Sequence, residues 1–363
     1  MSFFFENELR GKRMNERRWS LDIIRIIACF FVVVIHVFAY SIPIDNPKTV
    51  EWCFGNLVLS IVKSAVPLFF MISGVLFLRK QVSLKKLYTK YIFRIVVVMF
   101  VWAAFYAVFD SIKYAEETKV TARYFILRIL SGHYHLWFLP AILGAYICLP
   151  LLQLLTSKME KRQVLYLFGV IGVTVLGKVT VDSVLKEFFN TAVWNAFWEN
   201  FALSGVSVGI IYFLTGYYID QYKDMISREK CLLLYGISVA AGSGVNLLFA
   251  FALGRDVDFT RELLSIWVYV SSITLFLYLL KRFENYKPGE KTGNMIKTIS
   301  GCTFGVYLIH AFFIEQVCLK LEMQTSKFPY IPSVIMFSIG VFLCSLAVTW
   351  CLKKIPVLGK YIV

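Results

Sequence analysis

The sequence predicts an all-α fold, namely a polytopic membrane helical bundle of about ten transmembrane helices. Of the 363 residues, 58% are hydrophobic and only 17% are charged, whereas a soluble domain carries about a quarter charged residues. The mean hydropathy is +0.68. Apolar runs of about 20 residues, enough to cross a bilayer as a helix, recur from end to end.

Ten spans are expected, because backbone groups in lipid must find hydrogen-bond partners within their own segment, as a helix provides. They form a transmembrane domain over 19–352, between a basic N-terminal segment (1–18) and a basic tail (353–363). The expected spans are 19–40, 56–78, 91–109, 136–156, 163–182, 200–220, 231–253, 263–281, 298–319 and 331–352.

The distribution of basic residues predicts the orientation of these spans. With the N-terminus inside, the inner segments carry 24 of the 38 lysines and arginines and the outer connections carry 11. This excess predicts that both termini are cytoplasmic (N-in and C-in). The net charge of +15 is therefore a topology signal, and no nucleic-acid partner is expected. The basic start and the long apolar run behind it indicate a retained first span instead of a cleaved signal peptide.

The cysteines and glycines give weaker signals. The eight cysteines lie mostly within apolar runs without metal-ligand spacing, so no metal is predicted. Gly74 follows Pro67 in the second span, and GISVAAGSG in the seventh contains Gly236, Gly242 and Gly244. Small residues let membrane helices approach closely, so we interpret these glycines as packing positions. The amphipathic stretch TARYFILRIL, in the connection 110–135, is suited to the membrane interface.

The first span carries two residues that an apolar helix should not need, Arg25 and His36. Eleven residues place them about three turns and ~16 Å apart, on nearly the same face. An arginine within a span is by default a functional candidate facing a cavity or a partner. The alternatives are an arginine that snorkels or pairs with Asp22, three residues earlier, and a histidine that is simply hydrated near a span end.

The four histidines of the chain are all expected in the outer half of the membrane. His133 and His135 open the fourth span, next to Trp137, and His310 lies beyond the middle of the ninth. On the ninth span Tyr307 shares a face with His310. Glu315 falls off that face, so we do not pair it with His310.

Cationic residues characterise the inner half instead. Arg94 lies early in the third span, one turn after Lys90. Together with Arg25, Arg94 could bind phosphates, because a forked guanidinium suits phosphate oxygens. Lys90 is better explained as a positive-inside residue.

Cations inside and imidazoles outside suit a reaction whose donor is a cytoplasmic anion and whose acceptor is reached from the other side. Acyl transfer from a coenzyme A thioester is one such reaction. It needs a base for the acceptor hydroxyl, which neutral histidine provides near pH 7, and donors for the developing oxyanion. Whether an acyl-histidine intermediate forms is left open.

Five motifs occur in order, and together they resemble the acyltransferase-3 family of integral membrane O-acyltransferases, especially its surface-polysaccharide O-acetyltransferase branch. The first is the spacing of Arg25 and His36. The others are VPLFFMISGVLF, KYIFRI, HLWFLPAILGAYICLPLL and FGVYLIH. They lie between residues 25 and 310 of the chain. One departure is Lys90, where the family commonly has arginine.

The resemblance implies an acyltransferase of the bacterial cytoplasmic (inner) membrane. Acetyl-CoA would be the acyl donor, and a cell-surface glycan or lipid-linked sugar the acceptor, amid membrane lipids. His36, Tyr307 and His310 become catalytic candidates, and Arg25, Arg94 and Asp22 donor-binding ones. His133, His135 and Trp137 become candidates for binding the acceptor. With no further domain expected after the last span, the acyl group would reach its acceptor within the membrane domain.

Two other classes of protein remain open from sequence. One is a proton-coupled transporter or exporter of a small anion or lipid-linked sugar, in which the arginines bind anions and the histidines carry protons. The other is a membrane sensor that binds a ligand without converting it. Repeated halves, which many transporters have, are not apparent.

Overall fold

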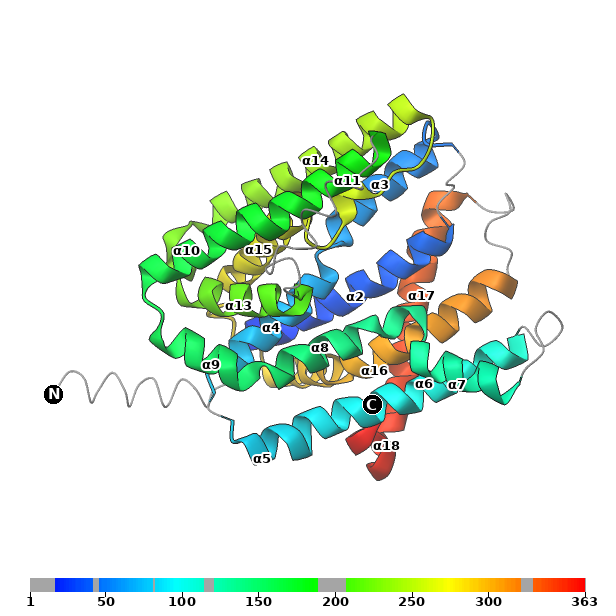
Figure 1. Ribbon diagram of the computed structural model, residues 1–363. Coiled ribbons are helices and arrows are strands. Elements are labelled where there is room, and N and C mark those ends of the chain that lie inside the picture. The colour runs from blue at the N-terminus through cyan, green and yellow to red at the C-terminus, as the bar shows by residue number, and fades with distance from the viewer. Residues whose placement is uncertain are drawn as a thin grey trace.

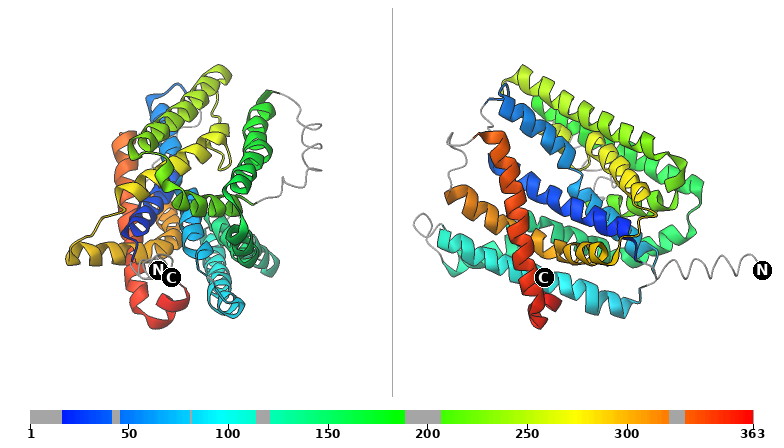
Figure 2. Two further views of the ribbon diagram at one scale, coloured as in Figure 1. Left: turned by 90° about the vertical axis from the view of Figure 1, so that its left-hand side faces the viewer. Right: turned by 180° about the vertical axis from the view of Figure 1, so that it is seen from behind.

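The computed structural model describes residues 17–41, 46–80, 82–113, 121–188, 207–320 and 329–362, and these residues are almost entirely helical. The all-α prediction is therefore confirmed. Figure 1 shows α2 and α16 near the middle of the bundle, with α10, α11 and α14 along one side and α6 along the other. Figure 2 shows α17 crossing these helices steeply on the far side.

Seven helices in the described part of the chain are long and apolar enough to cross a membrane. An eighth is obtained if the bent pair Tyr134–Ile147 and Leu149–Lys158, which turns by 55°, forms one span. The protein is thus a multi-pass membrane protein. The seven are Trp19–Ser41, Val50–Leu78, Leu84–Lys113, Lys161–Lys186, Arg228–Leu253, Glu290–Gln316 and Tyr330–Lys354.

Eight of the ten expected spans coincide with these segments, and two coincide with shorter helices. The expected span 200–220 overlaps α13, a helix of 14 residues, and 263–281 overlaps α15, with 17. Residues 200–206 lie outside the described residues. The count of ten and the cytoplasmic termini remain predictions.

Side-chain hydroxyls mark several helix starts. Thr49, Thr121, Ser227 and Ser265 each accept a hydrogen bond from a backbone N–H in the first turn of the following helix, which satisfies a donor that has no partner within the helix. The principal helices are α2 (Trp19–Ser41), α3 (Val50–Val62), α4 (Ala65–Leu78), α6 (Phe93–Lys113), α7 (Ala122–Ser131), α8 (Phe138–Ile147), α9 (Leu149–Lys158), α10 (Lys161–Ile171), α11 (Lys178–Phe188), α13 (Val208–Gln221), α14 (Arg228–Leu253), α15 (Ile266–Arg282), α16 (Glu290–Lys320), α17 (Tyr330–Lys354) and α18 (Pro356–Tyr361). Shorter turns are α5 (Leu84–Lys86), η1 (Leu87–Ile92), η2 (Tyr134–Trp137), η3 (Gly172–Gly177), η5 (Lys223–Met225) and η6 (Phe259–Arg261).

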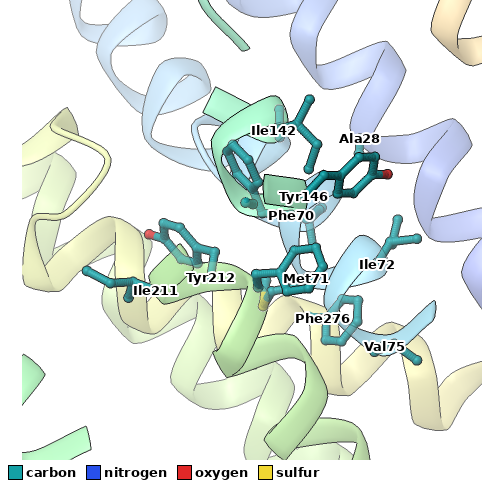
Figure 3. Packing of buried hydrophobic residues seen from close by; sticks show 14 of the residues in the cluster. Ala28, Phe70, Met71, Ile72, Val75, Ile142, Tyr146, Ile211, Tyr212 and Phe276 are labelled. Carbon is teal, nitrogen blue, oxygen red and sulfur yellow. The ribbon is translucent and has the colours of Figure 1, made fainter. Parts of the chain in front are cut away.

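The closest helix crossing in the core joins α4 and α13. A Cβ on Gly74 would lie 1.9 Å from the carbonyl oxygen of Phe213, and one on Gly216 would lie 2.3 Å from that of Met71. Figure 3 shows Met71 packed among buried residues of this region, including Phe276 and Tyr146. Gly74 therefore is a packing position, as its sequence context suggested, and Gly216 is a second one that the sequence analysis did not single out.

The glycines of α14 are only partly explained by packing. A Cβ on Gly242 would meet Trp267 at 3.1 Å, whereas no atom of the described residues lies within 4 Å of one on Gly236 or Gly244. The close-approach interpretation is therefore correct for Gly242 and is not supported for the other two by the described residues.

We expect Gly74→Ala to lower the stability of the protein. The new methyl group would collide with backbone, which cannot move aside as a side chain can, so the cost should reach at least the ~1–3 kcal/mol typical of overpacking. Thermal unfolding in detergent would measure it. Gly236→Ala is the matched control, since its methyl group would meet no atom of the described residues. Equal unfolding temperatures for the two variants would contradict the prediction.

Candidate functional site

Helix α2 presents both Arg25 and His36 to the same neighbour, α16. The guanidinium of Arg25 donates to Ser300 Oγ at 3.3 Å, and the ring of His36 lies 5.0 Å from that of His310, measured between centroids. Ser300 and His310 are ten residues apart on α16, which is ~15 Å along a helix. The sequence-based prediction that the two side chains share a face is consistent with this pairing along one helix–helix contact (Figure 1).

Asp22 belongs to the Arg25 end of this contact. Its buried carboxylate accepts from Ser300 Oγ at 2.7 Å and from Arg17 Nε at 2.6 Å, and it lies 3.5 Å from the guanidinium of Arg25. Acceptor-only oxygens surrounded by donors fix the orientation of those donors. Asp22 is thus placed to orient Arg25 and Ser300, while the Arg25 side chain remains 28% accessible.

Arg94 approaches the same region from α6. Its guanidinium lies 5.8 Å from the ring centroid of Phe304 on α16, and Tyr146 lies in the neighbourhood of both Arg94 and Arg25. Figure 3 shows Tyr146 close to Ala28 of α2. The two arginines predicted to act together therefore share a neighbour. Tyr146 was not predicted, because one of twenty tyrosines gives no signal in sequence.

All four histidines meet at the other end of α2 and α16. Successive ring centroids are separated by 5.0 Å between His36 and His310, 5.1 Å between His310 and His135, and 5.0 Å between His135 and His133. They come from α2, α16, η2 and the residue before η2. The sequence placed the four histidines in one half of the membrane, and the structure brings them into one continuous row.

The hydrogen bonds of His310 determine its tautomer. Nδ1 lies 2.7 Å from the carbonyl oxygen of Tyr307 and 3.3 Å from that of Val306. A carbonyl can only accept, so Nδ1 carries the proton and Nε2 carries a lone pair. Nε2 is buried and has no hydrogen-bond partner among the described residues. A buried imidazole lone pair without a partner is suited to accept a proton.

Main-chain carbonyl groups bind the side chains of Tyr307 and His135. The Tyr307 hydroxyl donates to the backbone carbonyl of His135 at 2.6 Å, and His135 Nε2 lies 3.2 Å from the carbonyl oxygen of Leu308. Tyr307 was predicted as catalytic, and its hydroxyl is instead occupied by main chain in this conformation. Trp137, predicted to contact the acceptor, is 41% exposed while His135 is 1% exposed, so it does not join the buried row.

The structure adds charged residues that the sequence analysis did not assign to the site. Glu315 Oε1 lies 3.1 Å from His133 Nε2, and Glu315 Oε2 lies 2.7 Å from Lys113 Nζ. Asp110 pairs with Arg128 of α7 at 2.7 Å. Glu315 was correctly left unpaired with His310, but it reaches the histidine row at His133. An acid within an apolar span was the available signal.

A cavity lined by hydroxyl groups lies apart from this site, among α3, α14 and α15. Its lining includes Ser60, Ser238, Thr260 and Arg261. None of the residues predicted to carry chemistry lines it.

The chain matches the family described as "Acyltransferase domain" (Acyl_transf_3) over residues 18–352. The protein belongs to this family, as its motifs suggested, and the match supports membrane acyltransferase activity. It is also 25% identical over 312 residues to a protein of Enterococcus faecalis named "Amino-acid racemase", covering 83% of this chain and 42% of that protein. The chain thus spans about two fifths of that relative's length. No solved structure matches.

Proposed function

We propose that the protein is an O-acyltransferase of the bacterial cytoplasmic membrane, and that it moves an acyl group, most simply acetyl, from acyl-CoA to a hydroxyl of a cell-surface or lipid-linked glycan. The observation that carries the proposal is the shared contact of α2 and α16, which has arginine at one end and paired imidazoles at the other.

The arginine end is suited to the polar part of the donor. Arg25 and Arg94 both lie near Tyr146, and the guanidinium groups of arginines suit the oxygens of a phosphate. The Asp22 carboxylate accepts hydrogen bonds from Arg17 and Ser300. Its single negative charge therefore does not neutralise Arg25 and Arg94 together. In this proposal Asp22 orients Arg25 and does not itself contact the donor.

The imidazole end is suited to the transfer step. His36 takes the proton of the acceptor hydroxyl as its oxygen attacks the thioester carbon. The carbon–sulfur bond then breaks. The thiolate of coenzyme A leaves, and the proton stays on His36. The buried lone pair of His310 Nε2 lies beside the ring of His36. In this proposal it accepts a hydrogen bond from the second N–H of the imidazolium that forms on His36, and so stabilises that charge.

A label-transfer assay tests the proposal. Membranes containing the protein would be mixed with acetyl-CoA labelled in the acetyl group, with and without extracted glycan. We expect label to appear on the glycan. Absence of label from glycan and protein alike, together with substrate flux into vesicles, would overturn the proposal in favour of a transporter.

A further inference from the structure

The contacts of His133 and His135 require more protons than two neutral imidazoles carry. His133 Nε2 faces Glu315, the two Nδ1 atoms face each other at 2.8 Å, and His135 Nε2 faces the carbonyl oxygen of Leu308. Each of the three contacts needs one hydrogen, and neither a carboxylate nor a carbonyl supplies it. The pair therefore holds three protons on four nitrogens, which is one positive charge.

The surroundings place that charge on His133. Besides Glu315, its Nε2 lies 4.0 Å from Asp110 Oδ1, and two nearby carboxylates favour the charged form of an imidazole. Its ring is also stacked on that of Tyr106, with centroids 4.2 Å apart and planes at 18°, an arrangement that stabilises a cation over an aromatic face. His135 is then neutral, with Nδ1 as acceptor and Nε2 as donor.

We propose that His133 is an imidazolium paired with Glu315, and that His133, His135 and Glu315 are positioning residues of the site. Both nitrogens of His133 and of His135 are occupied. Only His36 and His310 are then left to exchange a proton with a substrate. The positioning role of His133, His135 and Glu315 rests on the proposed acyl transfer. The positive charge on His133 does not depend on that proposal.

A metal ion is the competing occupant of this cluster. Ligand atoms of Asp110, His133 and Glu315 all lie within 4.8 Å of one another. However, Lys113 and Arg128 each lie 2.7 Å from one of the two carboxylates. A metal ion would add two positive charges beside these cations and would need the His133 lone pair, so the charges present favour a proton.

Solid-state ¹⁵N NMR of the ¹⁵N-histidine-labelled protein in lipid bilayers at pH 7.5 tests the proposal. With four histidines, each ring can be followed, and His133→Asn identifies the signal of that residue. We expect both nitrogens of His133 to be protonated, and one nitrogen each of His135 and His310. Glu315→Gln should abolish the doubly protonated signal, because the partner charge is gone. Glu290→Gln, at an exposed position of the same helix, should leave it unchanged.

Three outcomes would overturn the proposal. They are four neutral histidines in the unaltered protein, a protonated Glu315 carboxyl in the ¹³C spectrum, and a stoichiometric metal that the protein loses on Glu315→Gln. The measurement needs no substrate, so an imidazolium found in a protein without transfer activity would refute the proposed function and leave the charge assignment intact.

Discussion

Membranes containing His36→Gln should transfer label from acetyl-CoA to glycan at least ~100-fold more slowly than the unaltered protein, since general-base catalysis contributes about 10²- to 10⁴-fold. Glutamine retains a polar group of similar length but cannot take a proton near neutral pH. The ring of His36 lies beside those of His310 and Tyr134, and glutamine is close to histidine in size, so the fold should tolerate the change. Initial rates at equal protein level would measure the effect.

The control for this variant is a change of similar size away from the site. Arg162→Gln alters an exposed residue at the start of α10 and should transfer label at the normal rate. His310→Gln should also slow transfer, because it removes the lone pair of Nε2. A His36→Gln protein that is folded and fully active would disprove the assignment of the base.

For Arg25→Gln, we expect the KM for acetyl-CoA to rise about 10- to 100-fold, the range given by losing a charged hydrogen bond worth ~1.5–3 kcal/mol. Arg25→Lys should recover only part of this loss, because an ammonium keeps the charge but lacks the guanidinium fork. Rates measured over a range of donor concentrations would separate KM from kcat.

The fold should survive Arg25→Gln because Asp22 keeps two other partners. Arg17 Nε remains 2.6 Å from the Asp22 carboxylate, and Ser300 still donates to it. Ser300→Ala removes the hydroxyl that accepts from Arg25 and donates to Asp22 but leaves the guanidinium in place, so it should change KM far less. An unchanged KM in Arg25→Gln would show that the donor does not contact this residue.

The helices, and the relative placing of residues within one helix, could be predicted from sequence. Long apolar runs specify helices wherever they occur, and the spacing of Arg25 and His36 determines their common face from helix geometry alone. The common face of Tyr307 and His310 follows from helix geometry in the same way.

The remainder depends on which helices are neighbours, which periodicity does not encode. Glu315 lies 202 residues from Lys113 along the chain, and nothing local to either residue links them. Tyr307 likewise is a catalytic candidate from its position one turn before His310, and only the bundle shows that its hydroxyl donates to the main chain of His135. Hydropathy gave the expected spans 200–220 and 263–281 the same standing as the others, although the described helices there, α13 and α15, are shorter, because hydropathy registers apolar character better than helix length.

Because α16 carries both Ser300 and His310 on one unbroken helix, the site contains a rigid molecular ruler. A straight helix does not compress, so the ~15 Å between these two positions is a constant of the protein. In the proposed reaction, a donor whose anionic group and reactive carbonyl are much closer together could occupy either end but not both. The distance between the anionic group and the thioester of the donor, more than the charge of the donor, would then decide which thioesters the protein uses.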